Sequence, residues 1–149
     1  MPNSSPVPLK SLVQALNDGI EFYRIASKKV EHEDFRQAFD ELAQSHALAK
    51  AYLQPYLIMQ TGRAEEGHTF GGKLHHTYIE LEDNGNLDHD YTLLKQLEQV
   101  ETVTLDMMQV TAALSENALV KTVIKGLIPK IQACRMRVIQ LEEVTRLQQ

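Results

Sequence analysis

The sequence lacks several features that would define its class. Cys134 is the one cysteine among 149 residues, which excludes an internal disulfide framework and suits a reducing compartment. No apolar run reaches the roughly 18 residues that a membrane-spanning helix requires. No Lys/Arg block is present, and the net charge of -5 disfavours nucleic-acid binding. We therefore expect a cytoplasmic protein whose partners are neither membranes nor nucleic acids.

Familiar catalytic motifs are also missing. There is no Gly-rich phosphate loop, no Gly-x-Ser-x-Gly and no Cys-x-x-Cys. Hydrophobic residues nevertheless make up 43% of the chain, which is enough for one sizeable core. We expect a flexible arm over residues 1–7 and a single all-α domain over residues 8–147.

Apolar residues recur at helical spacing in four long segments. The predicted helices cover residues 8–30, 33–57, 87–114 and 117–147. Pro8 fits the first turn of a helix, Pro55 should loosen the last turn of the second, and Ser115 or Asn117 should cap the fourth. The short connection over residues 31–34 predicts that the first and second helices pair antiparallel.

The connection over residues 60–86 is much longer than the usual 2–8 residues between bundle helices. Thr69 is a candidate cap for a short extra helix within it. That helix would carry Phe70, Leu74, Tyr78 and Leu81. A crossover of this length can travel along the bundle, so the second and third long helices are expected to run parallel.

Four polar residues lie on or beside the apolar stripes, near the middles of the four helices: Tyr23, His46, Glu101 and Arg135. Glu101 is central, because a carboxylate on a buried helix face is costly unless a partner satisfies it. One interpretation is a structural network in which Arg135 pairs with Glu101, while His46 and Tyr23 complete the hydrogen bonds.

The other interpretation is a metal site. Two-metal bundles take a Glu from each of two helices and a Glu-x-x-His pair from each of the others. Here Ala43 precedes His46 at the required spacing, and Gln132 and Arg135 stand where Glu and His are needed. The incomplete candidate ligands are Glu21, His46, Glu98 and Glu101. Iron or manganese would suit carboxylates and imidazole, but no cofactor is predicted, and a mononuclear or weak site is left open.

Three further features have simpler interpretations. His75 and His76, with His68 shortly before them, could bind metal at a surface or symmetry interface, but a solvated His pair is expected because there is no fixed metal-ligand spacing. Cys134 lies on an apolar stripe and is interpreted as a small buried hydrophobe. Gly19 lies at the edge of the first stripe, where another helix is expected to approach closely.

Apolar residues that lie off the main stripes, and are therefore expected to be exposed, indicate a second packing surface on the first two helices. They are Phe22, Ile25, Leu48 and Tyr52. We expect a homodimer to bury this surface, with the crossover helix as the alternative cover.

Three local strings resemble an uncharacterised bacterial family of ferritin-like proteins of unknown function. They are Leu16-Asn-Asp-Gly-Ile-Glu-Phe-Tyr23, Phe39-Asp-Glu-Leu-Ala43 and Phe70-Gly-Gly-Lys-Leu-His75. The resemblance covers roughly residues 9–145 and implies a four-helix bundle without an established activity. We expect a ferritin-like bundle that lacks an intact di-metal centre and acts as a non-catalytic binding or assembly protein. The alternative is a metal-dependent oxidase or iron-handling protein with an unconventional Glu/His ligand set.

Overall fold

The computed structural model describes residues 6–69 and 89–147, and these residues form helices and no strand. The helices are α1 (Pro6–Lys29), α2 (Glu33–Thr61), α4 (His89–Leu114) and α5 (Ala118–Leu147). The all-α four-helix prediction is confirmed. The short crossover helix and most of the predicted arm lie outside the described residues.

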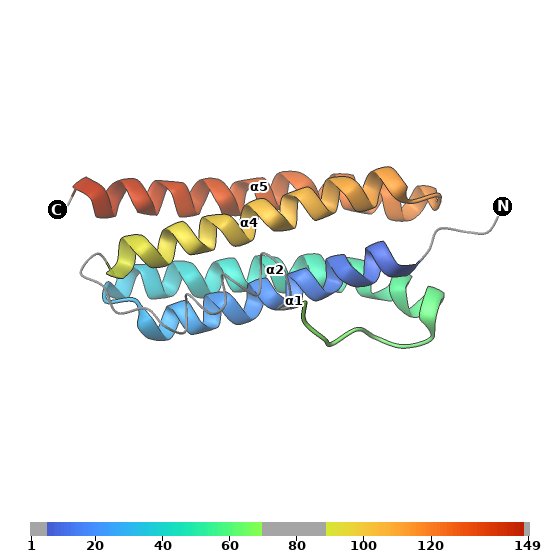
Figure 1. The fold of residues 1–149 in the computed structure, drawn as a ribbon, viewed down its shortest axis with the longest axis horizontal. Helices are drawn as coiled ribbons and strands as arrows, with labels where there is room; N and C mark the ends of the chain where they lie inside the picture. The colour runs from blue at the N-terminus through green and yellow to red at the C-terminus, as the bar shows by residue number, and fades with distance from the viewer. Residues whose placement is uncertain (1–5, 70–88, 148–149) are drawn as a thin grey trace.

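The four helices form a bundle in which α2 and α4 run in the same direction (Figure 1). α1 packs against α2 and α4, while α5 packs against α4 and α2. The pairs α1/α5 and α2/α4 therefore face each other diagonally across the centre. The parallel arrangement of α2 and α4 agrees with the prediction from the long connection between them. Side chains from the middles of all four helices can meet at this centre.

The helix ends differ slightly from the predicted ones. α1 begins at Pro6, two residues earlier than expected, because the first turn of a helix does not need the missing proline N–H. α2 continues through Pro55 and ends where Gly62 adopts a left-handed φ of 84°. The Gly62 amide closes the helix by donating to the Ile58 carbonyl at 2.7 Å. Pro55 is exposed, and α2 continues for six residues beyond it to Thr61. The helix therefore does not end near Pro55.

Asn117 provides the predicted cap of α5. Its side-chain oxygen accepts hydrogen bonds from the backbone amides of Leu119 at 2.9 Å and Val120 at 3.1 Å. Two N–H groups that the first helical turn leaves unpaired are satisfied in this way.

The core consists of the four apolar stripes. Its largest fully buried side chains are Tyr23, Phe22, Phe39, Leu12, Leu16, Leu53, Leu57, Leu93, Leu94, Leu97 and Met108. The expectation that Phe22 is exposed is wrong, and Ile25 is partly buried against the core. Leu48 and Tyr52 remain about half exposed, at 49% and 53%. The surface predicted for a homodimer is thus narrower than expected, and the dimer stays a prediction.

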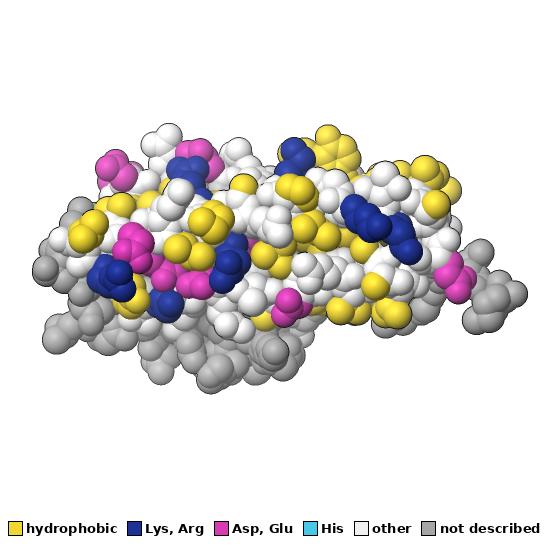
Figure 2. All heavy atoms as spheres, turned by 90° about the horizontal axis from the view of Figure 1, so that it is seen from above, with side chains coloured by type: hydrophobic (Ala, Val, Ile, Leu, Met, Phe, Trp, Pro, Cys, Tyr) yellow, Lys and Arg dark blue, Asp and Glu magenta, His cyan; other side chains and the backbone are white. Residues whose placement is uncertain are grey.

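The outer surface carries mixed chemistry. On the face that includes α5, apolar, acidic and basic side chains are interspersed, and the described residues there form no continuous basic stripe (Figure 2). Met136 and Val144 are among the exposed apolar residues of α5. None of the helices in the described part of the chain has the length and apolar character needed to cross a membrane.

Candidate functional site

The carboxylate of Glu101 lies at the centre of the bundle, with no exposed surface. The Tyr23 hydroxyl from α1 donates a hydrogen bond to Oε2. His46 from α2 lies across the diagonal, with Nε2 2.9 Å from Oε2 and 3.0 Å from Oε1. Tyr23 and His46 are themselves fully buried. Three of the four residues predicted for a polar network are therefore brought together around one buried carboxylate.

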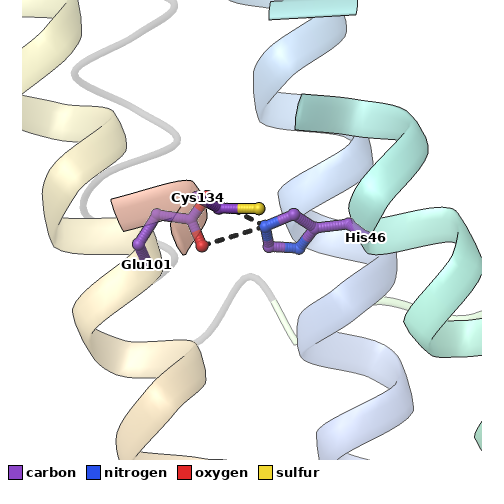
Figure 3. A group of neighbouring side chains, drawn as sticks. All are labelled: His46, Glu101 and Cys134. Carbon is purple, nitrogen blue, oxygen red and sulfur yellow. Dashed lines mark hydrogen bonds and ion pairs between the residues drawn. The ribbon is translucent and has the colours of Figure 1, made fainter. Parts of the chain in front are cut away.

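Cys134 completes the centre from α5. One ligand-capable atom from each of His46, Glu101 and Cys134 lies within 4.8 Å of the others. Figure 3 shows the thiol pointing to the same space as the imidazole and carboxylate. Cys134 is only 4% exposed. Together with Tyr23, each of the described helices contributes one polar or sulfur-bearing side chain to the middle of the bundle.

Gly19 makes room for His46. A Cβ added at Gly19 would lie 2.6 Å from Nδ1 and 2.8 Å from Cε1 of the imidazole, which is shorter than real contacts allow. The close helix approach expected at Gly19 is therefore contact with this one side chain. Tyr23, one turn further along α1, also packs against the imidazole, with ring centroids 5.6 Å apart. The α1 backbone and a core aromatic thus fix the orientation of His46.

The negative charge of this centre belongs to Glu101. Burial, followed by the Glu101 charge, raises the pKa of the Cys134 thiol to about 12. The same two causes raise the pKa of Tyr23 well above its ordinary value. Thiol and phenol therefore both keep their protons at neutral pH, and Tyr23 acts as a hydrogen-bond donor to the carboxylate.

Nδ1, the second ring nitrogen of His46, is buried and packs toward Gly19, and it has no hydrogen-bond partner among the described residues. Because Glu101 accepts at Nε2 and no described residue accepts at Nδ1, the tautomer with the ring proton on Nε2 is the favoured one. A ring nitrogen without a proton at Nδ1 costs less than a buried N–H without an acceptor. Beside Gly19, such a nitrogen can at most accept a weak C–H contact.

Arg135 does not join the centre, so its predicted pairing with Glu101 is wrong. Its guanidinium donates to Thr102 Oγ1 at 3.2 Å and to Glu98 Oε2 at 3.3 Å. The side chain is 37% exposed. Successive residues on a helix point about 100° apart, so Cys134 takes the inward direction and Arg135 points to the flank. A cysteine on an apolar stripe gave the only sequence signal for the fourth member.

Glu98 belongs to a separate cluster between α4 and α5. Lys95 lies 3.3 Å from a carboxylate oxygen of both Glu98 and Glu142. Burial, and a hydrogen bond from its protonated carboxyl to Glu98, raise the pKa of Glu142 to about 7. The same hydrogen bond lowers the pKa of Glu98. This pair shares a proton near neutral pH, and Arg135 and Lys95 offset the remaining charge.

Glu21, another weak metal candidate, lies elsewhere again. It lines a surface pocket of about 550 Å³ on α1 and α2, together with Arg24 and Lys50. The pocket is lined by both polar and apolar side chains and lies outside the buried centre. Within the described residues, Glu101 is thus the one carboxylate of the centre, whereas a di-metal site requires several.

Asp18 has a structural role that the sequence did not reveal. It is fully buried, and it accepts hydrogen bonds from the Thr69 amide at 3.1 Å and from the Thr69 hydroxyl. His68 Nδ1 lies 2.9 Å from the same carboxylate. His68 therefore helps to hold the start of the crossover against α1. His75 and His76 lie outside the described residues.

The neighbouring residue adds to this attachment. The Asn17 amide donates to the Glu65 carbonyl at 3.3 Å and to the Gly67 carbonyl at 2.8 Å. Contacts within the bundle thus give a structural role to several residues of the Leu16–Tyr23 string. Asn17 and Asp18 hold the crossover, Gly19 admits His46, and Tyr23 holds Glu101.

Comparisons with known proteins agree with this fold. A hypothetical protein from Pyrococcus furiosus has a similar structure, with a TM-score of 0.72 and 11% sequence identity over 97% of this chain and 91% of that chain. At 11% identity, this similarity supports the four-helix architecture, and we infer no activity from it. No curated protein matches the sequence. The ferritin-like and bacterial parts of the predicted resemblance stay predictions.

A family match covers residues 7–114, from α1 through α4. It includes Tyr23, His46 and Glu101, whereas Cys134 on α5 lies beyond it. The match confirms the prediction of a family without known function. The chain belongs to the family described as a domain of unknown function, DUF2383.

Proposed function

We propose that this chain is a binding protein, built on a bundle whose centre does not perform di-metal redox chemistry. The observation that carries the proposal is the number of carboxylates around the centre. Glu101 is the one carboxylate there among the described residues, and Tyr23 and His46 already hold it. A di-metal centre needs bridging and terminal carboxylates to neutralise two dications.

The positions that would supply the other ligands support the same conclusion. Ala43 precedes His46 by three residues, and Gln132 is exposed on α5. Glu98 pairs with Arg135, and Glu21 lines the surface pocket. Bringing Glu21 to Glu101 would require α1 to rotate and bury a charged flank, at a large desolvation cost. Glu98 lies on the same helix as Glu101, so no rotation of α4 brings its carboxylate closer.

An iron oxidation assay tests this proposal. Fe²⁺ is added aerobically to chelator-treated protein at two equivalents per chain, and the absorbance of oxidised iron and the oxygen consumption are followed. We expect both rates to equal the rates measured with the Glu101→Gln variant under the same conditions. Rapid oxidation that saturates at two iron ions per chain and disappears in Glu101→Gln would overturn the proposal.

The alternative function is a metal-dependent oxidase with an unconventional ligand set. An oxidase needs an open coordination position that oxygen can reach. His46 and Glu101 have no exposed surface and Cys134 has 4%. This closed environment favours binding over turnover, and the same iron assay separates the two functions.

A further inference from the structure

We propose that the bundle centre is a single-ion site for a borderline-soft divalent cation of the zinc type, ligated by His46 Nε2, Glu101 Oε1 and Cys134 Sγ. The inference rests on the proposed binding function and names the ligand class. One ligand comes from each of α2, α4 and α5, so a bound ion would join three helices at one point (Figure 3).

The geometry fits one ion of this size. In a tetrahedral site with bonds of about 2.0–2.3 Å, two ligand atoms lie about 3.3–3.8 Å apart. One ligand-capable atom from each of the three residues lies within 4.8 Å of the other two, and His46 Nε2 lies 3.0 Å from Glu101 Oε1. Small side-chain adjustments therefore suffice. The space between three ligands from separate helices holds one ion, because a second would need further ligands.

The donor set selects the class of cation. A thiolate, an imidazole and a carboxylate match zinc and chemically similar ions. Mg²⁺ and Ca²⁺ prefer oxygen ligands alone, and both would leave the Cys134 thiol unused. Tyr23 would act beside the ion by holding Oε2 of Glu101, which leaves Oε1 to ligate. Such a hydrogen bond orients a ligating carboxylate.

Electrostatics favour a cation at this point. The Glu101 carboxylate is fully buried beside the Cys134 thiol, so a dication between the two groups would be attracted to the carboxylate and would offset the charge of the thiolate that forms. On binding, the Cys134 thiol loses its proton to the buffer as the metal–sulfur bond forms. The His46 ring proton passes from Nε2 to Nδ1 as Nε2 becomes a ligand. No group is oxidised or reduced.

The structure also sets a limit on affinity. Protonated Nδ1 would face Gly19 without an acceptor among the described residues, whereas most ligating histidines donate this proton to a partner. One buried unpaired donor weakens binding by roughly 5- to 150-fold relative to a site that has the acceptor. We therefore expect a weaker site than a dedicated structural zinc centre.

Cobalt is the probe that reports the ligands directly. Chelator-treated protein is equilibrated anaerobically with Co²⁺ under reducing conditions, with long incubation because the site is closed. We expect one Co²⁺ per chain, a thiolate-to-cobalt charge-transfer band, intense tetrahedral visible bands, and displacement of all of them by Zn²⁺. Cys134→Ser should lose the charge-transfer band, and His46→Gln should lose at least ten-fold in affinity.

Two control variants separate this site from other cobalt binding. Arg135→Gln changes the neighbour of Cys134, and His68→Gln changes a surface histidine, so both should retain the wild-type spectrum. Circular dichroism establishes that every variant is folded. If a variant loses helicity, the thermal unfolding of wild-type protein is measured with and without Zn²⁺ instead. Zn²⁺ should then raise the midpoint of unfolding.

Several outcomes would overturn the inference. They are no cobalt binding by folded wild-type protein, binding without a charge-transfer band, and an unchanged spectrum in Cys134→Ser. None of them alters the iron oxidation result, which is measured with a different ion and with oxygen. Conversely, rapid oxidation of two iron ions per chain would refute the proposed binding function even if cobalt bound through Cys134.

Discussion

Replacing Gly19 by alanine tests the packing at the centre of the bundle, because two physical effects oppose each other there. In a helix interior this change is expected to stabilise by about 1 kcal/mol, since alanine has the higher helix propensity. The new methyl group would, however, lie 2.6 Å from Nδ1 of His46, against ordinary contacts of 3.4–4 Å. The imidazole would have to retreat by at least 0.8 Å, the difference between 3.4 and 2.6 Å.

The clash should win. Overpacking a core costs about 1–3 kcal/mol. Displacing the imidazole also weakens its hydrogen bond to Glu101, which adds about 1–3 kcal/mol for buried groups left unpaired. After the propensity gain, Gly19→Ala should lower the free energy of unfolding by about 1–5 kcal/mol.

Gly126→Ala is the matched control. Gly126 also lies in a helix interior, but it is exposed on α5, and an added Cβ meets nothing within 4 Å. This variant should gain up to about 1 kcal/mol. Urea unfolding followed by far-UV circular dichroism measures both changes, with equal m-values as evidence that the unfolding reaction is unchanged.

A double-mutant cycle identifies the clashing partner. In a His46→Ala background the imidazole is gone, so Gly19→Ala should lose its cost and become neutral or stabilising. The reasoning is refuted if Gly19→Ala stabilises the wild-type protein as much as Gly126→Ala does. It is also refuted if its cost persists without His46.

Three other perturbations have defined outcomes. Because the pKa of Glu142 is raised to about 7, the contribution of this residue to stability is complete below about pH 4.5 and is lost as the pH rises through about 7. Glu142→Gln should therefore be more stable than wild type in urea unfolding at pH 8 but not at pH 4.5. The control Glu143→Gln, at an exposed position, should show no such pH-dependent gain. Asp18→Ala should cost about 1–3 kcal/mol and accelerate hydrogen exchange of the Thr69 amide, and unchanged exchange would contradict the attachment of the crossover. Arg135→Gln should change stability by less than about 1 kcal/mol, because its ion pair is partly exposed, and a larger loss in thermal or urea unfolding would contradict this placement.

The polar centre could be predicted largely from the sequence because helical periodicity assigns direction. Tyr23, His46 and Glu101 lie on apolar stripes, so the side chains point inward, and their positions along the helices place them at one level. The long connection before α4 likewise predicted the parallel arrangement of α2 and α4. These inferences depend on local spacing and on connection length, both of which are visible in one chain.

The fourth member of the centre was harder to predict. Cys134 and Arg135 are adjacent, so an error of one residue turns the inward direction by about 100°. Charge complementarity made Arg135 the plausible partner of a buried carboxylate, whereas cysteine is indistinguishable from an apolar residue in the stripe. The packing of α5 against both α2 and α4 determined which of the two points to the centre.

The role of Asp18 could not be predicted for a different reason. Its partner Thr69 is 51 residues away, in a long connection whose path over the bundle local spacing does not determine. Only tertiary folding brings that segment to α1. Pro55 gives a related lesson, because a residue that disfavours helix is tolerated when its position is exposed and the flanking turns are anchored by Leu53 and Leu57.

The most direct test of the single-ion centre is a crystal structure of Zn²⁺-loaded protein, with anomalous diffraction recorded on both sides of the zinc absorption edge. The account predicts one anomalous peak at the bundle centre, about 2.0–2.3 Å from His46 Nε2, Glu101 Oε1 and Cys134 Sγ. Absence of a peak there in a crystal that binds zinc elsewhere would contradict the account. So would two peaks about 3.5–4 Å apart, the separation typical of a two-metal site.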